Sequence, residues 1–262
     1  KLEKVLFWYF GDIMYKSPKK CNDNVLVKIF KYTSCEKRFR EIRHNYNGKI
    51  CIARTLNNIV KVKERNKFIE QLLVKYVQEE PLRKILLLGD RIEQLEVIKE
   101  AFDKHKLCET DFYIGRMKMK QLKKAEEAKI LFATYSMASE ALDIPTLNTL
   151  FLITPRKNVE QAVGRILRKS DHKVQPLIVD ITDSLKTFMN QGYCRRRYYK
   201  SLNYKIEISD VKNNEILATE ELDYKKKVNK VEIVKSETDS DSEDNDGFVD
   251  SESDDEIVEI QN

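Results

Sequence analysis

Residues 129–153 read KILFATYSMASEALDIPTLNTLFLI, and the two apolar runs 129–133 and 149–153 are separated by a segment of helical length. Strands of continuous apolar character are typical of a sheet that is buried on both faces. The same alternation of apolar strand and amphipathic helix continues on both sides of this stretch. It predicts βαβ units and a doubly wound parallel α/β sheet, covered by helices on both faces.

The alternation covers most of the chain. The apolar side chains of Phe68, Leu72 and Tyr76 recur at helical spacing and predict a helix that ends before Pro81. Residues 33–60 are mixed and polar, and we interpret them as a connecting segment. The predicted strands are 25–32, 84–88, 111–114, 129–133, 149–153, 175–181 and 203–208, and the predicted helices are 62–77, 91–105, 117–128, 137–141, 158–168 and 186–200.

The charge is divided unevenly along the 262 residues. Residues 236–262 contain 12 acidic residues and no Lys or Arg, so residues 1–235 carry 48 Lys and Arg against 31 Asp and Glu, a net charge of +17. The stretch 236–256, SETDSDSEDNDGFVDSESDDE, has too few apolar residues to offset the entropy of ordering. It predicts a disordered acidic tail that is either a solubilising segment or a site of phosphorylation.

Several classes of protein are excluded by composition. The longest apolar runs are about one fifth of a membrane span, which excludes a membrane protein. The five cysteines lie far apart without a Cys-x-x-Cys pattern, so we expect free thiols, no metal site and a reducing intracellular compartment. Because the chain does not begin with Met, we expect a piece of something longer.

The segment Gln161-Ala-Val-Gly-Arg165-Ile-Leu-Arg168 is the first candidate for chemistry. On a helix, Gln161, Arg165 and Arg168 lie on one stripe, where two guanidinium groups suit a phosphate. A glycine inside a helix costs about 1 kcal/mol relative to alanine, so Gly164 requires a reason. The alternative interpretation is a solvated basic helix face.

Two further candidates follow predicted strands. Ligands of open α/β sheets bind outside the carboxyl ends of the strands, where 133–145 places Thr134, Ser136, Ser139, Glu140 and Asp143. Ordinary loop and capping roles are the alternative for these five residues.

The second strand-end segment is Tyr113-Ile-Gly115-Arg116-Met-Lys118. Here Gly115 exposes backbone N–H groups, and Arg116 and Lys118 add positive charge, which together suit a nucleic-acid phosphate. A basic loop without function is the alternative.

In this order the three segments resemble the C-terminal motor lobe of superfamily 2 helicases of the DEAD/DEAH type. The chain is most similar to viral and phage relatives of the excision-repair helicase and the poxvirus transcript-release helicase. Residues 161–168 match motif VI, Q-x-x-G-R-x-x-R, while 133–145 resemble motif V and 85–90 resemble motif IV. The resemblance covers about residues 55–185 and implies a RecA-like fold.

The resemblance also divides the chain. Residues 1–60 would be the end of the first lobe and a connecting segment, and 61–208 the C-terminal RecA-like lobe. Residues 209–235 would be a charged linker before the acidic tail at 236–262.

The resemblance implies roles for the candidate residues. Arg165 and Arg168 would reach the γ-phosphate of ATP as an arginine finger, with Gln161 orienting them. Asp143 and Gly164 would face the nucleotide. The residues that would contact the backbone of one nucleic-acid strand are Gly115, Arg116, Lys118 and Thr134.

Two features depart from the family pattern. Ala141 stands where motif V commonly has glycine, and Gly115-Arg116 where such sequences often have a glycine pair. The chain has no G-x-x-x-x-G-K-[ST] and no Asp-Glu-x-His or Asp-Glu-x-Asp. We therefore expect ATP and Mg²⁺ to be held mainly by a first lobe that is not in this chain, and the isolated chain to be inactive.

Two functions remain open at this stage. The first is a motor lobe that acts on nucleic acid, with DNA favoured, and that pairs with an N-terminal helicase lobe. The second is a catalytically incomplete nucleic-acid-binding module whose acidic tail recruits a protein partner. A small-molecule α/β enzyme lacks support because the histidines are scattered. A viral origin, and with it a virion or a cytoplasmic virus factory, follows from the resemblance.

The cluster Arg195-Arg196-Arg197-Tyr198-Tyr199 also has two interpretations. It either extends the nucleic-acid track by charge and stacking, or belongs to a helix that docks across the lobe with its arginines in water.

Overall fold

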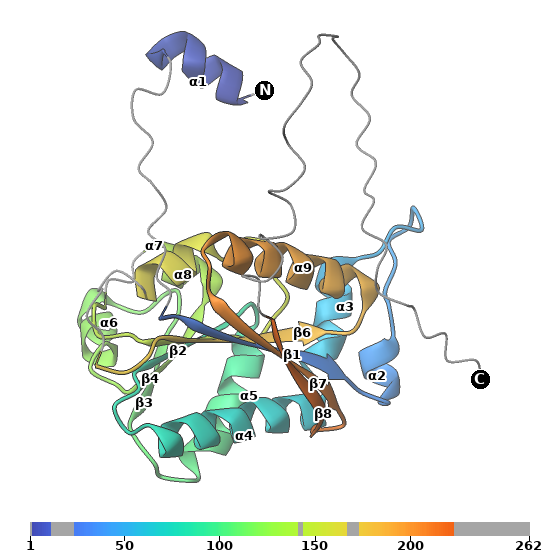
Figure 1. Ribbon diagram of the computed structural model, residues 1–262. Coiled ribbons are helices and arrows are strands. Elements are labelled where there is room, and N and C mark those ends of the chain that lie inside the picture. The colour runs from blue at the N-terminus through green and yellow to red at the C-terminus, as the bar shows by residue number, and fades with distance from the viewer. Residues whose placement is uncertain (1, 12–23, 141–143, 167–172, 223–262) are drawn as a thin grey trace, which may run out of the picture. The chain divides into compact units, whose positions relative to one another are not determined.

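The computed structural model describes residues 2–11, 24–140, 144–166 and 173–222 (Figure 1). Its helices are α1 (Leu2–Phe10), α2 (Lys37–Arg40), α3 (Ile52–Ile59), α4 (Lys63–Glu79), α5 (Ile92–Asp103), α6 (Met119–Ala125), α7 (Tyr135–Glu140), α8 (Glu160–Ile166) and α9 (Lys186–Ser201). Its strands are β1 (Leu26–Thr33), β2 (Ile85–Gly89), β3 (Thr110–Tyr113), β4 (Ile130–Thr134), β5 (Thr149–Leu152), β6 (Leu177–Asp183), β7 (Lys205–Lys212) and β8 (Glu215–Leu222).

The strands form one eight-stranded sheet in the order β3-β4-β2-β5-β6-β1-β7-β8. Every pair from β3 to β7 is parallel, and β8 joins β7 as an antiparallel hairpin. The carboxyl ends of the seven parallel strands therefore lie along one edge of the sheet. The predicted doubly wound α/β architecture is confirmed.

Side chains of each central strand alternate between two cores, one on each face of the sheet. In β2, Leu86 and Leu88 pack into the core beneath α6, α7, α8 and α9, whereas Ile85 and Leu87 pack into the other core, which α4 and α5 cover (Figure 1) and to which α3 also contributes. Because both faces are covered, these strands read as continuous apolar runs rather than as alternating ones.

The place of β1 in the sheet could not be read from the sequence. The predicted strand 25–32 exists, but it lies inside the sheet, where Leu26 pairs with Leu177 of β6 on one side and with Lys205 of β7 on the other. Residues 1–60 therefore include an interior strand of the sheet, and the connecting segment 33–60 contains α2 and α3. Local sequence patterns do not show pairing between strands so far apart in the chain.

The C-terminal boundary also differs from expectation. The predicted last strand, 203–208, extends to Lys212, and residues 215–222 of the expected charged linker form β8. Nearly all residues of β8 are exposed, so this strand lacks the alternation of apolar and polar residues that marks a half-buried strand. The rest of the linker and the acidic tail lie outside the described residues.

Gly192 lets α9 approach β6 closely. A Cβ atom built on Gly192 would lie 2.6 Å from Cγ2 and 2.9 Å from Oγ1 of Thr182. The glycine therefore brings α9 against the strand that carries the polar groups described below.

We predict that Gly192→Ala lowers the free energy of unfolding by about 1–3 kcal/mol, because the added methyl group overpacks this contact. Thr182→Ser removes the nearer of the two atoms and should restore part of the loss in the double variant. Urea unfolding would measure both, and a Gly192→Ala variant of unchanged stability would contradict the prediction.

Candidate functional site

The carboxyl edge of the sheet brings two predicted segments together. Thr134 ends β4, and residues 114–118 follow β3, which is the neighbouring strand. The half-buried Thr134 hydroxyl lies 3.2 Å from that of Ser136. Gly115, Arg116 and Lys118 are exposed. The four residues that were predicted to contact nucleic acid therefore lie at or just after the carboxyl ends of two adjacent β-strands, β3 and β4.

Neither of the two candidate glycines is required by packing within the described chain. A Cβ atom on Gly115 or on Gly164 would meet no described atom within 4 Å. In the segment 113–118, the left-handed backbone conformation falls on Arg116, with φ of 73°, rather than on Gly115. The open space beside both glycines leaves their backbone accessible from outside.

The motif VI segment forms α8 as predicted. Ala162 and Val163 are buried against the core, whereas Gln161 and Gly164 are exposed on the opposite side. Arg165 belongs to the same helix, but its side chain lies outside the description. Arg168 and Asp143 lie outside the described residues, so the predicted nucleotide-facing set is described only in part.

A buried ion pair fixes the segment that leads into α8. Nε and Nη2 of Arg195 on α9 donate to the two carboxylate oxygens of Asp180 on β6, at 2.7 and 2.6 Å. The remaining Nη1 donates to the backbone carbonyl of Arg156, at 2.6 Å. The Tyr199 hydroxyl also donates to Asp180, at 3.0 Å. Arg195 and Asp180 are both about 1% exposed, so this cluster is closed to solvent.

A second buried pair holds the same segment from the other face of the sheet. Arg65 on α4 donates from Nε and Nη2 to the two carboxylate oxygens of Asp183, at 2.7 and 3.0 Å. Its Nη2 also donates to the carbonyl of Ile153, at 2.7 Å. Because Ile153 and Arg156 both lie between β5 and α8, the two arginines fix one connection from opposite sides.

The pKa shifts follow from this burial. Burial opposes the charged form of Arg195, but the Asp180 carboxylate outweighs it and raises the pKa of Arg195 above its ordinary value. Burial raises the pKa of the Asp183 carboxyl, and Arg65 opposes that shift without cancelling it. Burial also raises the pKa of Tyr199 and of Tyr135, so both phenols remain hydrogen-bond donors at neutral pH.

Arg156, in the loop before α8, connects the motif IV and motif V segments. Its Nη1 lies 3.2 Å from the Asp90 carboxylate after β2, and its guanidinium carbon lies 4.8 Å from the centre of the Tyr135 ring. Tyr135 donates from its hydroxyl to the carbonyl of Thr154, at 3.1 Å, and the Thr154 hydroxyl donates to Asp90, at 3.2 Å. The ends of β2, β4 and β5 are thus joined by one polar network.

Neither interpretation of the Arg195–Arg197 cluster applies to all three arginines. The helix docks across the lobe, but Arg195 is buried in an ion pair rather than in water. Arg196 is half-buried with its guanidinium carbon 5.2 Å from the centre of the Tyr193 ring, and Arg197 is exposed. The sequence did contain a signal that Arg195 is buried. Arg195 recurs at helical spacing with the other buried residues of α9, which are Phe188, Gly192 and Tyr199.

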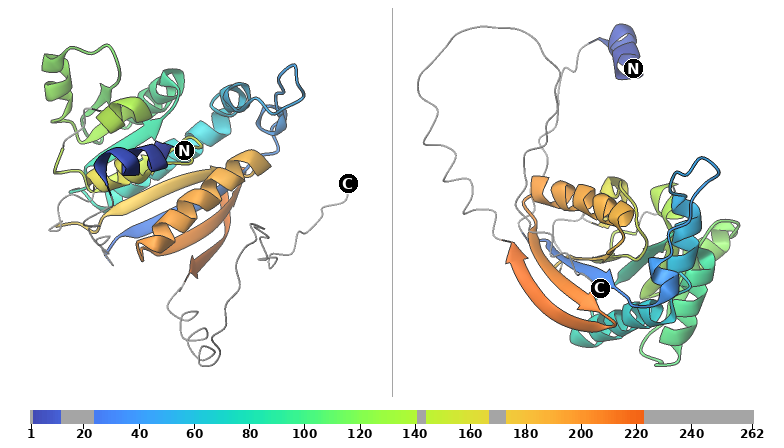
Figure 2. Two further views of the ribbon diagram at one scale, coloured as in Figure 1. Left: turned by 90° about the horizontal axis from the view of Figure 1, so that it is seen from above. Right: turned by 90° about the vertical axis from the view of Figure 1, so that its right-hand side faces the viewer.

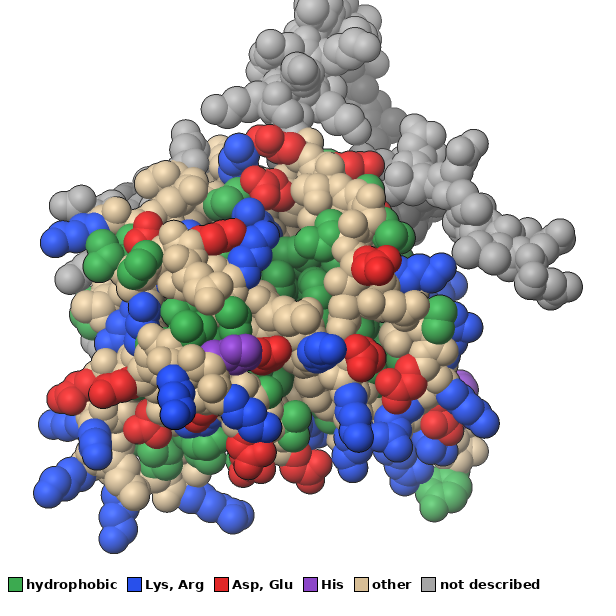
Figure 3. Space-filling model, turned by 90° about the horizontal axis from the view of Figure 1, so that it is seen from below, with side chains coloured by type: hydrophobic (Ala, Val, Ile, Leu, Met, Phe, Trp, Pro, Cys, Tyr) green, Lys and Arg blue, Asp and Glu red, His purple; other side chains and the backbone are tan. Residues whose placement is uncertain are grey.

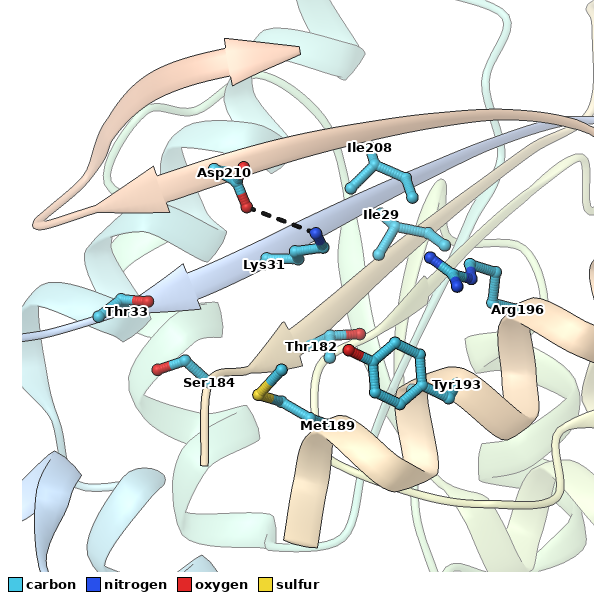
Figure 4. A pocket seen from close by; sticks show the side chains of 11 residues that line it. Ile29, Lys31, Thr33, Thr182, Ser184, Met189, Tyr193, Arg196, Ile208 and Asp210 are labelled. Carbon is cyan, nitrogen blue, oxygen red and sulfur yellow. Dashed lines mark ion pairs between the residues drawn. The ribbon is translucent and has the colours of Figure 1, made fainter. Parts of the chain in front are cut away.

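A pocket of about 280 Å³ lies beside this cluster, between α9 and the ends of β1, β6 and β7 (Figure 4). Ile29, Ile208 and Met189 supply its apolar surface, and Lys31 and Arg196 lie on opposite walls. Lys31 forms an ion pair with Asp210 at 3.8 Å. Among the predicted site residues whose side chains the structure describes, none lines this pocket.

The face of the molecule that carries α4 and α5 has a mixed charge. Figure 3 shows Lys and Arg side chains among Asp and Glu over most of this face. Pairs on the two helices include Lys75 with Glu79 and Lys99 with Asp103. Among the described residues, no group of three or more His, Cys, Asp or Glu is placed to hold a metal ion, and no helix is long and apolar enough to cross a membrane.

Comparison with known proteins connects this geometry to a family. No protein-family model matches the chain. The mimivirus protein "Putative ATP-dependent RNA helicase L396" is 33% identical over 210 residues, which are 78% of this chain and 40% of that protein. African swine fever virus QP509L, which has the same designation, is 31% identical over 140 residues, 50% of this chain and 27% of that protein. The chain thus spans less than half the length of either relative.

The crystal structure of T4 UvsW shares the fold. It matches 73% of this chain and 42% of its own chain with a TM-score of 0.55 and 18% sequence identity. Over most of its length the chain is therefore similar to part of viral proteins that are named putative ATP-dependent RNA helicases, and it shares its fold with T4 UvsW. The resemblance that the motifs indicated is confirmed.

We predict that Arg195→Met lowers the free energy of unfolding by about 3–5 kcal/mol, because it leaves the Asp180 carboxylate buried without its partner. Arg197→Met is the matched control on the same helix and should change stability by less than about 0.5 kcal/mol, since Arg197 is exposed. Urea unfolding of the two variants would measure the difference. Equal losses in both would contradict the assigned role of the pair.

Proposed function

We propose that this chain is the C-terminal motor lobe of an ATP-dependent nucleic-acid helicase or translocase, supplying an arginine finger and half of the strand-binding track. The observation that carries the proposal is α8. This helix presents Gln161 and Gly164 to solvent on an open side, and its preceding segment is held by two buried Arg–Asp pairs. A helix fixed in this way suits a phosphate clamp, because preorganised charges need no rearrangement when the phosphate binds.

The nucleotide would be ATP bound together with Mg²⁺. Hydrolysis of the γ-phosphoryl group of ATP would drive the motor. Arg165 and Arg168 would neutralise charge on the γ-phosphate, and Gln161 would orient them. Asp143 and Gly164 would face the nucleotide. Because the P-loop sequence is absent from these 262 residues, ATP and Mg²⁺ would be held mainly by an N-terminal lobe.

The track that binds one nucleic-acid strand would run over the carboxyl ends of β3 and β4. Arg116 and Lys118 would pair with phosphates, and Gly115 and Thr134 would approach the backbone of one strand. Contacts to the backbone give binding with little sequence preference and a strong dependence on salt. The family resemblance favours DNA as the substrate, whereas the names of both viral relatives specify RNA.

The alternative function is a binding module without motor activity, in which the acidic tail recruits a protein partner. Its support is the net charge of +17 on residues 1–235 beside a tail with no Lys or Arg. The viral relatives support a viral origin, and the free thiols of Cys35, Cys51, Cys108 and Cys194 fit a reducing compartment such as a cytoplasmic virus factory or a virion.

We predict that ATPase activity appears when this chain is mixed with a separately made first lobe that carries a P-loop, and is absent in the chain alone. Arg168→Ala should reduce the turnover of the mixture by about 10³–10⁵-fold, the range for an arginine finger. Lys173→Ala, a nearby exposed cation, is the control and should retain activity. Silence of every mixture, together with nucleic-acid binding, would favour the binding module.

We also predict that Lys118→Gln weakens binding of single-stranded DNA and RNA. Loss of one phosphate contact should reduce the slope of log K against log salt by about 0.7. Lys75→Gln is the control on the far side of the sheet, where Lys75 pairs with Glu79 at 3.7 Å. Fluorescence anisotropy across a salt series would measure both, and equal slopes for wild type and Lys118→Gln would exclude Lys118 from the track.

A further inference from the structure

The segment between β1 and α4 carries an excess of positive charge. Residues 37–54, here called the basic arm, contain six Lys and Arg residues and one acidic residue, Glu41. The six cations are Lys37, Arg38, Arg40, Arg43, Lys49 and Arg54, and all are exposed. The arm follows the carboxyl end of β1, so it begins at the same sheet edge as the predicted track.

A short hairpin forms the tip of the basic arm. Asn45 N–H donates to the carbonyl of Lys49 at 2.8 Å, and Cys51 N–H donates to that of Arg43 at 2.7 Å. The turn is closed by Gly48, whose φ of +70° favours glycine over other residues. These backbone bonds give the tip a defined conformation.

The base of the hairpin is anchored to α3. Arg43 N–H donates to the Thr55 hydroxyl at 3.0 Å, and that hydroxyl donates to the Cys51 carbonyl at 2.9 Å. At the other end of α3, Asn57 accepts a hydrogen bond from Arg91 at 2.7 Å. Since Arg91 follows β2, which neighbours β4, α3 connects the arm to the part of the edge that carries Thr134. Figure 2 shows the hairpin projecting beyond the helices beside it.

Tyr46 lies at the tip of this hairpin with 101% exposure, so its ring packs against nothing in the described chain. Folding therefore gives no reason for an aromatic residue at this position. Lys49 and Arg54 make no ion pair within the described ranges, whereas Arg43 is paired with Glu41 at 3.0 Å. An exposed aromatic ring on a hydrogen-bonded hairpin, in a segment that also carries unpaired cations, is a combination that suits single-stranded nucleic acid, in which phosphates pair with charge and bases stack on rings.

We propose that the basic arm is a second contact for single-stranded nucleic acid, in which Tyr46 stacks on a base and Lys49 and Arg54 bind phosphates. This inference rests on the proposed function, because it assumes that the lobe binds a strand at the β3 and β4 ends. The arm would extend that track across the carboxyl edge of the sheet, over α3.

The first test is Tyr46→Ala in the full chain, with binding of labelled oligo(dT) and oligo(U) measured by anisotropy. Loss of one stacked base should weaken binding by about 5- to 100-fold, and Tyr46→Phe should retain most of the affinity. The fold is not at risk, since the ring is fully exposed. Tyr193→Ala on α9 is the aromatic control and should bind as wild type does. Unchanged binding of Tyr46→Ala to both oligonucleotides would overturn the proposal.

The second test replaces the two unpaired cations, as Lys49→Gln with Arg54→Gln. The salt slope should fall by about 1.4, twice the value for one phosphate on a single strand. A wild-type slope in this double variant would overturn the phosphate role. The two proposals fail in different ways: if wild type binds neither oligonucleotide, the proposed function fails, whereas wild-type binding that depends on Lys118 but not on Tyr46 refutes the basic arm alone.

Discussion

Two carboxylates of β6, Asp180 and Asp183, organise the functional edge of this lobe. They project to opposite faces of one central strand, where Asp180 binds Arg195 of α9 and Asp183 binds Arg65 of α4. Each guanidinium also donates to a backbone carbonyl between β5 and α8, Arg195 from Nη1 and Arg65 from Nη2. An unpaired charge at this depth would cost several kcal/mol. The strand, two helices and the start of α8 are therefore held together as one unit.

This constraint connects elements that the sequence motifs treat separately. Arg156 has its carbonyl bound by Arg195, while its side chain contacts Asp90 after β2 and Tyr135 after β4. A displacement of the end of β4 at Thr134 would thus also displace the segment that leads into α8. The contacts form a continuous physical path between the proposed strand track and the proposed phosphate clamp.

The sequence predicted the central architecture because apolar strands and amphipathic helices have different periods. The motif VI helix, with Ala162 and Val163 buried and Gln161 exposed, was predicted for the same reason. The buried ion pairs were not predicted, although Asp180 and Asp183 interrupt an apolar strand and Arg65 shares the buried stripe of Phe68 and Leu72. A lone charge on an apolar face signals a partner, but the identity of that partner depends on the fold. The place of β1 depends on long-range pairing for the same reason.

The place of β1 has a consequence for synthesis of the chain. This strand emerges from the ribosome well before its two partners, Leu177–Asp183 and Lys205–Lys212. Domains fold during synthesis as their parts become available, and parallel pairing across long loops is slow. A nascent chain must therefore wait with Leu26–Thr33 unpaired on both edges until most of the lobe is translated. During that interval the strand is open to pairing with other chains, so the early part of this sequence is where a chaperone has most reason to act.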